Sequence, residues 1–212
     1  FLHNVDILYH CAGELHDESI MYSLHVEGTK RLLNLAIGKV GRWVQLSSVG
    51  AYGAFNGIKI NEKTLEIPVG TYESTKTKAD DLVRKIATKE RLNYVILRPS
   101  IVFGELMPNT SLKQMLFLIK KSLFFYPNRN ANVNYVHVED VINALTLCGE
   151  RRVAIGNVYI LSDSVPLKKM VDSFSEGLKV KSPSLYLPAF IVYLIVNIFG
   201  GIPKFPLSKK RL

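Results

Sequence analysis

The most direct chemical signal in this chain of 212 residues is a tyrosine followed four positions later by a lysine. Tyr72 and Lys76 share one face if residues 71–81 are helical. A free phenol loses its proton near pH 10, and an adjacent cation favours the charged form. We therefore expect Lys76 to lower the pKa of Tyr72, so that Tyr72 acts as an acid or a base near neutral pH.

A serine precedes this pair by the spacing that a strand and a loop need. Ser48 follows the apolar run 43–46, and its hydroxyl is suited to holding the substrate oxygen whose proton Tyr72 takes or gives. A Tyr-x-x-x-Lys pattern alone is short, and such a pair is more often a solvated surface pair. The segments around it favour the active-site interpretation.

Six segments occur in the order typical of one enzyme family. They are Val-Asp-Ile-Leu-Tyr-His-Cys-Ala-Gly at 5–13, His-Val-Glu-Gly-Thr at 25–29, the serine segment 43–53, Tyr72 to Lys76, Leu-Arg-Pro-Ser-Ile-Val-Phe-Gly at 97–104, and Asn-Tyr-Val-His-Val-Glu-Asp-Val at 134–141. In these segments the chain resembles the extended short-chain dehydrogenase/reductase family. Within that family, the six segments resemble those of the NAD-dependent epimerase/dehydratase group.

The resemblance implies a site and a reaction. The expected catalytic residues are Ser48, Tyr72 and Lys76. The residues expected to bind NAD or NADP are Ala12, Gly13, Tyr72, Lys76, Pro99, Ser100 and Ile101. Hydride transfer at the nicotinamide would accompany proton transfer by Tyr72, while Lys76 holds the nicotinamide ribose.

The family's glycine-rich phosphate loop belongs on the first strand-to-helix turn, and no such loop occurs in this sequence. We expect the chain to be an internal fragment that lacks this N-terminal loop. The residue that reads the adenosine ribose would also lie upstream, so the choice between NAD and NADP stays open.

Hydrophobic patterning predicts an α/β fold. Short apolar runs at 6–9, 43–46, 94–97 and 158–161 are typical of buried parallel strands, and helical periodicity covers 23–37, 74–90, 111–123 and 140–148. We expect a Rossmann-like doubly wound parallel sheet with a small C-terminal substrate lobe. Residues 1–165 would form the nucleotide-binding part, with lobe segments embedded at about 105–135, and 166–212 the helical remainder of the lobe.

The most apolar run is 188–199, followed by Lys204, Lys209, Lys210 and Arg211. It is shorter than the ~20 residues that span a bilayer. Two interpretations remain: a helix packed on the substrate lobe, or an interfacial helix that makes peripheral contact with anionic lipid.

The net charge of +9 favours anionic partners without naming one. Nucleic acid is not expected, because the lysines form no aromatic-interleaved groove. Cys11 and Cys148 give no disulfide framework and suggest reduced core or near-core thiols in a cytoplasmic protein. The five histidines show no metal-ligand spacing, so no metal is expected.

Three functions follow. The first is an epimerase, dehydratase or reductase of a nucleotide-linked sugar in surface polysaccharide biosynthesis. The second is a reductase or dehydrogenase of an apolar alcohol, resembling 3-beta-hydroxysteroid dehydrogenases or dihydroflavonol reductases, and the third is a catalytically silent nucleotide-binding member. His25 stands where the family carries Asn, and Ile101 where UDP-galactose 4-epimerases place a substrate-contacting Asn. A homodimer through the Tyr72 helix is expected only by analogy.

Overall fold

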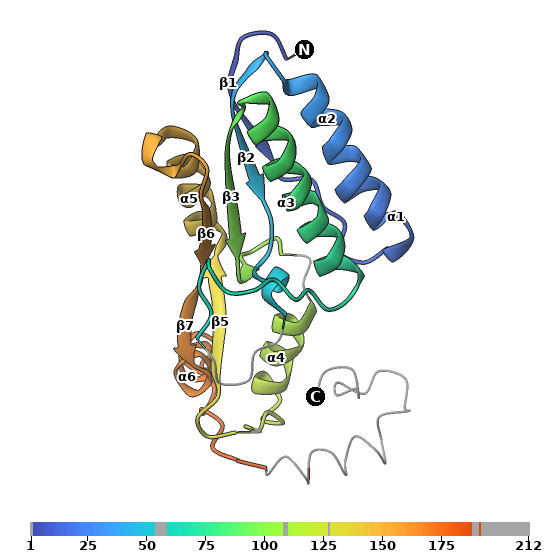
Figure 1. Ribbon diagram of the computed structural model, residues 1–212. Helices are drawn as coiled ribbons and strands as arrows, with labels where there is room; N and C mark the ends of the chain where they lie inside the picture. Colours follow the sequence, from blue (N-terminus) through green and yellow to red (C-terminus); the bar gives the residue numbers. More distant parts are fainter. Residues whose placement is uncertain (1, 54–58, 108–109, 127, 188–190, 192–212) are drawn as a thin grey trace. The chain divides into compact units, whose positions relative to one another are not determined.

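The computed structural model describes residues 2–53, 59–107, 110–126, 128–187 and 191 (Figure 1). The chain divides into two compact units. The first unit comprises Phe1–Gly104 and Tyr135–Asp163, and the second comprises Glu105–Asn134 and Ser164–Leu212. All the expected catalytic and cofactor-binding residues belong to the first unit.

A four-stranded parallel sheet forms the centre of the first unit. The strands are β1 (Val5–His10), β2 (Val40–Leu46), β3 (Asn93–Pro99) and β6 (Val158–Leu161), and they lie side by side in that order. Their apolar and β-branched side chains suit strands that are covered on both faces. Each of the four strands expected from the sequence is present.

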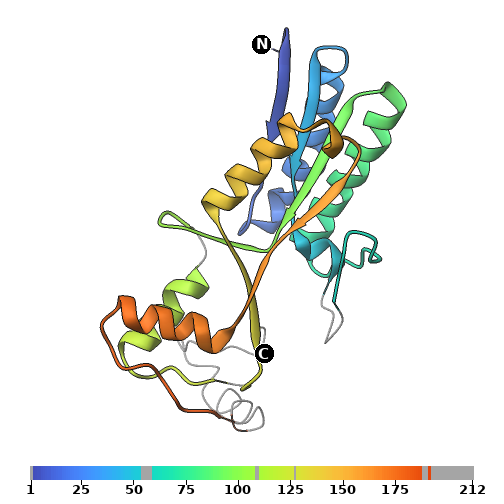
Figure 2. The ribbon, with the colours of Figure 1, turned by 90° about the vertical axis from the view of Figure 1, so that its left-hand side faces the viewer.

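Helices cover both faces of this sheet (Figures 1 and 2). On one face Trp43 packs with Leu33 of α2 (Thr29–Ala36) and Val83 of α3 (Thr71–Glu90). On the other face Val44 and Val95 pack with α5 (Val138–Glu150). Because side chains alternate along a strand, neighbouring residues such as Trp43 and Val44 enter opposite cores. The expected doubly wound α/β fold is confirmed.

The region expected to form one helix at 23–37 instead belongs to a run of three successive helical segments that starts at Glu18. Asp17 caps α1 (Glu18–Tyr22) by accepting a hydrogen bond from the Ser19 amide, then a π-helical segment, η1 (Ser23–Gly28), leads into α2. Sequence periodicity missed the first turn, because a capping carboxylate and polar residues carry no apolar pattern. α3 begins at Thr71, as the expected placement of Tyr72 and Lys76 on one helix requires, and its apolar periodicity starts one turn later because the first turn is polar.

Several shorter elements link these helices and strands. The 3₁₀ turns η2 (Val49–Tyr52) and η3 (Arg152–Ala154) follow β2 and α5. β4 (Ile101–Phe103) pairs in parallel with the end of β5 (Asn132–His137), and β7 (Asp163–Pro166) follows in the order β4-β5-β7.

The second unit has a core of its own. α4 (Thr110–Lys120) contributes Ile119, α6 (Leu167–Gly177) contributes Val171, and Tyr126 packs between Phe124 and Tyr186. The apolar run 188–199 lies, except for Ile191, outside the described residues. Among the residues that are described, no helix has the length and hydropathy needed to cross a membrane.

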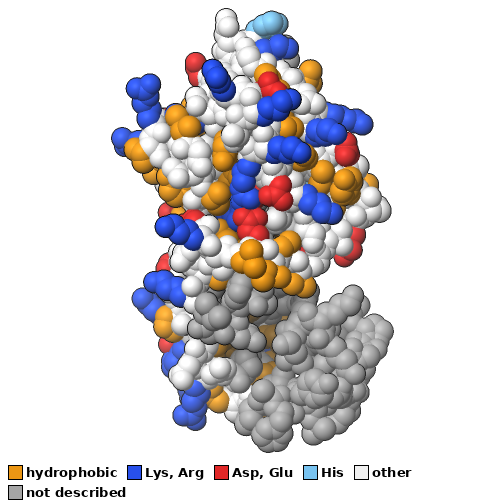
Figure 3. Space-filling view, in the orientation of Figure 1, with side chains coloured by type: hydrophobic (Ala, Val, Ile, Leu, Met, Phe, Trp, Pro, Cys, Tyr) orange, Lys and Arg blue, Asp and Glu red, His pale blue; other side chains and the backbone are white. Residues whose placement is uncertain are grey.

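Figure 3 shows Lys and Arg side chains spread over the visible face, with Asp and Glu among them. The positive charge is therefore dispersed on this face, rather than gathered in one stripe.

Candidate active site

The candidate site lies at the carboxyl edge of the parallel sheet. The Ala12–Gly13 turn follows β1, Ser48 follows β2, and Ser100 follows β3. Since parallel strands all point the same way, the segments that leave their ends gather at one edge, where ligands bind in such sheets.

Ser48 is held by the turn that it begins. Its backbone is extended, and its Oγ accepts a hydrogen bond from the Gly50 amide at 3.1 Å, so Ser48 caps η2. Gly53 ends this turn with φ of 74°, a conformation that L side chains rarely adopt. The hydroxyl of Ser48 is thus fixed by local backbone geometry, with its second lone pair and its proton free for a substrate oxygen.

Tyr72 and Lys76 occupy the second and sixth positions of α3, one turn apart. The Lys76 side chain is buried, and its Nζ donates to the Leu46 carbonyl at 2.7 Å and to the Ala12 carbonyl at 3.5 Å. These bonds tie the helix to the ends of β1 and β2. Burial lowers the pKa of Lys76, while Asp80 and Cys11 oppose that shift.

The Tyr72 pKa moves in the direction opposite to the sequence prediction. Burial, followed by the nearby Glu73 and Asp80 carboxylates, raises the pKa of Tyr72 to about 12. The prediction was wrong because helical spacing says nothing about how deeply a phenol is buried or which carboxylates face it. In this state Tyr72 is a neutral phenol and a proton donor.

The segments expected to hold the cofactor include both exposed and buried residues at the carboxyl edge of the sheet. Ala12 and Gly13 are exposed, Pro99 ends β3 in the interior, and Ile101 is 46% exposed. The Ser100 amide donates to the Leu161 carbonyl at 2.8 Å.

The donors at this edge fit a nicotinamide cofactor. A third Lys76 N–H remains beyond its two carbonyl contacts. The buried Ser100 hydroxyl has no partner within the described ranges. Both groups can therefore serve the ribose and carboxamide of a cofactor lying against the exposed Ala12–Gly13 turn.

Sequence reasoning recognised His25 only as a departure from the family pattern. The side chain is 1% exposed, and its Nε2 accepts a hydrogen bond from the Glu14 amide at 2.8 Å. Its Nδ1 lies 2.8 Å from Thr75 Oγ1, and its ring meets Tyr72 edge-on at 5.6 Å between centroids. The departure itself was the available signal, because a neutral imidazole has one donor and one acceptor nitrogen on different sides of the ring and can bridge two partners.

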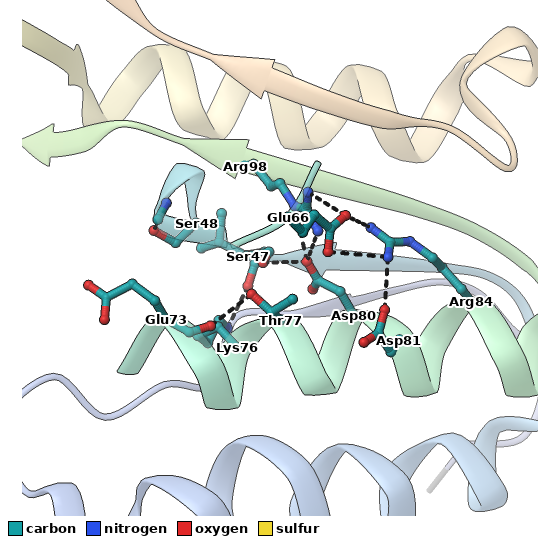
Figure 4. Close-up of polar contacts among 12 residues, drawn as sticks. Ser47, Ser48, Glu66, Glu73, Lys76, Thr77, Asp80, Asp81, Arg84 and Arg98 are labelled. Carbon is teal, nitrogen blue, oxygen red and sulfur yellow. Dashed lines mark hydrogen bonds and ion pairs between the residues drawn. The ribbon is translucent and has the colours of Figure 1, made fainter. Parts of the chain in front are cut away.

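A buried ion network beside the site was also missed (Figure 4). Arg98 from β3 is fully buried and donates to Asp80 of α3 through Nε at 3.1 Å and Nη2 at 2.8 Å. Ser47 Oγ donates to the same Asp80 oxygen at 2.7 Å, and Arg98 Nη1 lies 2.9 Å from Glu66 Oε1. The network fixes the end of β2 and the loop before α3 relative to α3 and β3.

Cys11 differs from its expected environment. It is exposed in the turn after β1, whereas Cys148 is buried, and both thiols are free. The expectation of core or near-core thiols was wrong for Cys11, because the buried part of β1 ends at His10 and the chain then turns outward. Within the described ranges, no group of three His, Cys, Asp or Glu residues could hold a metal ion.

A parallel sheet with helices on both faces, and polar groups gathered at its carboxyl edge, defines the class of Rossmann-like nucleotide-binding proteins. Comparison with known sequences narrows the class to a family. Residues 1–161 match the model of the NAD dependent epimerase/dehydratase family, and the chain belongs to that family.

Similar proteins include members with different named substrates. The UDP-glucose 4-epimerase of Vibrio cholerae is 23% identical over 215 residues, covering 94% of this chain and 65% of that protein. The decarboxylating sterol-4-alpha-carboxylate 3-dehydrogenase of Candida albicans is 29% identical over 158 residues, covering 69% of this chain and 44% of that protein.

Among solved structures, the UDP-glucuronic acid 4-epimerase of Bacillus cereus, in complex with NAD, has a TM-score of 0.73 at 18% identity. The match covers 88% of this chain and 64% of that protein, and it supports the fold. This chain thus spans about two thirds or less of the length of these relatives.

Proposed function

We propose that the full protein containing this chain is an NAD(P)-dependent enzyme that acts on a nucleotide-linked sugar by hydride transfer, oxidising a carbinol carbon or reducing the corresponding carbonyl carbon. The observation that carries the proposal is the convergence of Ser48, Tyr72 and Lys76 at the edge next to the Ala12–Gly13 turn. The Lys76 ammonium, which contacts carbonyls from the ends of both β1 and β2, makes that convergence specific.

Each residue has a distinct role in this proposal. Ser48 donates its hydroxyl proton to the substrate oxygen and orients it. Tyr72 gives its proton to that oxygen during reduction and takes a proton from it during oxidation. Lys76 holds the cofactor ribose and stabilises the tyrosinate left after proton transfer. Acceptance and return of hydride is the chemistry that a bound nicotinamide cofactor supplies.

The raised pKa of Tyr72 affects which direction of the reaction, reduction or oxidation, the resting site is ready for. A neutral phenol is ready to protonate a carbonyl oxygen, so reduction needs no prior change at Tyr72. Oxidation needs the tyrosinate, and a positively charged oxidised nicotinamide nearby would favour that form.

Support for a sugar nucleotide comes from the relatives. The Vibrio cholerae relative is named for UDP-glucose, and the Bacillus cereus neighbour for UDP-glucuronic acid. The excess of basic residues suits an anionic cofactor and an anionic substrate together.

A second candidate is the oxidation or reduction of an apolar alcohol. The relative from Candida albicans named as a sterol dehydrogenase is the observation in its favour. A silent binder is the weakest candidate, because a protein that only binds nucleotide has no chemical need for Ser48, Tyr72 and Lys76 together.

The test uses the full-length protein with NAD or NADP and a panel of UDP- and dTDP-hexoses, and follows sugar identity by proton NMR. A parallel series offers sterols and flavonoid-like alcohols and follows nicotinamide absorbance. Tyr72→Phe is the control, since it removes the proton carrier and keeps the ring. Sugar conversion that is lost in Tyr72→Phe supports the proposal. Turnover only of apolar alcohols, or of no substrate despite bound cofactor, contradicts it.

A further inference from the structure

His25 connects two parts of the candidate site that lie far apart in the sequence. Through Nε2 it holds the Glu14 amide, in the turn after β1, and through Nδ1 it meets Thr75, between Tyr72 and Lys76 on α3. The point at which Gly13 would carry a Cβ lies 3.8 Å from His25 Nε2 and 4.0 Å from Lys76 Nζ. His25 and Lys76 therefore support the same turn from neighbouring positions.

The backbone around His25 is unusual in a way that serves this contact. His25 lies within the π-helical segment η1, between two α-helical segments. A π-helical turn is wider than an α-helical one, and such segments occur frequently at functional sites. The local widening reorients the side chains of 23–28 relative to α1, and His25 is one of the two buried residues of the segment.

The hydrogen bonds define one tautomer. Nε2 accepts from a backbone amide, so it carries no proton. The Thr75 hydroxyl uses its single proton on backbone carbonyls of the preceding turn, at 2.8 Å from Thr71 O and 3.0 Å from Tyr72 O. Thr75 Oγ1 must then accept from His25, which places the imidazole proton on Nδ1.

We infer that His25 is a positioning residue: with Nδ1–H bonded to Thr75 and Nε2 bonded to the Glu14 amide, it holds the cofactor-facing turn in register with Tyr72 and Lys76. The inference rests on the proposed function, because it assigns the turn to cofactor binding. His25 does not touch the reacting atoms in this role.

Protonation of Nε2 would break the hydrogen bond from the Glu14 amide, so the connection that His25 makes between the turn and α3 depends on pH. The charged or titratable groups that face the ring are Lys76 and Tyr72 from α3, Glu14 from the turn, and His10 from the end of β1. Burial and the Lys76 charge lower the pKa of His25, and Glu14 opposes them. The hydrogen bond between the Glu14 amide and His25 Nε2 therefore persists as pH falls through the ordinary His range near 6.5, and is lost only below that range.

The first test examines the tautomer in the full-length protein without any ligand. NMR of isotope-labelled histidine should show the His25 imidazole with its proton on Nδ1, staying neutral as the pH falls through 6.5. A proton on Nε2, or ordinary titration of His25, would overturn the inference.

The second test measures cofactor binding in two variants. His25→Phe keeps the ring against Tyr72 and loses both hydrogen bonds, and Thr75→Val removes the acceptor for Nδ1–H. Each should raise the Kd for NAD or NADP by about tenfold, the usual order for a lost buried hydrogen bond, with kcat changed less than the Kd. His16→Gln changes an exposed histidine in the stretch before α1; it is the matched control and should bind NAD or NADP as wild type does.

The outcomes separate this inference from the proposed function. Wild-type Kd in both variants would overturn the positioning role. If His25→Phe does not fold, Thr75→Val and the wild-type tautomer decide. Failure of the wild-type protein to bind any nicotinamide cofactor, with the tautomer as expected, would overturn the proposed function and with it the assignment of the turn to a cofactor.

Discussion

At the scale of single residues, Tyr72 illustrates how burial and charge compete. The phenol lies one helical turn from an ammonium, yet burial and two carboxylates hold its pKa at about 12. Lys76 directs its N–H groups at backbone carbonyls of β1 and β2, which limits what it contributes to the phenol in this state.

This pKa makes stability fall at alkaline pH. The unfolded chain releases the Tyr72 proton near pH 10, whereas the folded protein keeps it until about 12. The unfolded state therefore binds fewer protons within that window, and the free energy of unfolding falls as pH rises. Between pH 9 and pH 11, wild type should lose about 1 kcal/mol more than Tyr72→Phe, as measured by urea unfolding.

The other tyrosines cancel in that comparison, because both proteins carry them. Equal losses in the two proteins would show that Tyr72 titrates normally.

Cys11 offers a second residue-level prediction. It is exposed in the turn that faces the proposed cofactor site, while Cys148 is 5% exposed. Iodoacetamide should modify Cys11 well before Cys148, and saturating NAD or NADP should slow the modification of Cys11 only. Mass spectrometry of the modified peptides gives both rates, and Cys11→Ser identifies the fast site. Protection of Cys148 without protection of Cys11 would be inconsistent with a cofactor at this turn.

At the scale of the elements, Arg98 determines how β2, β3 and α3 meet. Its guanidinium is fully buried and joins Asp80 to Glu66. Arg98→Met keeps much of the volume and leaves the Asp80 carboxylate without its cation, and removing one partner of a buried pair costs about 3–5 kcal/mol. Urea unfolding should show that loss.

Arg84→Met is the matched control, because Arg84 binds the same Glu66 but its side chain is 29% exposed. A partly exposed pair contributes about 1 kcal/mol or less. Equal effects of the two substitutions would contradict a dominant structural role for Arg98.

The strands and most of the helices could be predicted because apolar periodicity reports which face is buried. The π-helical segment could not, since one widened turn leaves no period in the sequence. The spacing of Tyr72 and Lys76 also correctly predicted that they lie on one helix. Spacing could not reveal the Arg98–Asp80 pair or the contact of His25 with Thr75, because these partners are 18 and 50 positions apart and meet only when their elements pack together in the folded protein.

At the scale of the whole molecule, the two units have separate hydrophobic cores. The first unit carries the carboxyl edge of the sheet with the turn after β1, Ser48 and α3, and the second packs around Ile119, Tyr126 and Val171. Residues 105–134, in the second unit, include the segments that sequence reasoning assigned to substrate. Separate cores allow local opening of one unit to change with little effect on the other.

Hydrogen exchange of backbone amides can show which of the two units each ligand contacts. NAD or NADP should slow exchange of amides at 11–14, 46–48, 72–76 and 99–101 in the full-length protein, because a bound cofactor stabilises the closed form of the turns that it contacts. A UDP-hexose added to the cofactor complex should extend protection into 105–134. Tyr72→Phe should keep the protection at 11–14, 46–48 and 99–101, since the substitution removes one phenol oxygen and leaves Lys76 and the turn after β1 in place. Protection that starts in the second unit, with no change at 11–14, would place the cofactor elsewhere and contradict the site built around Ser48, Tyr72 and Lys76.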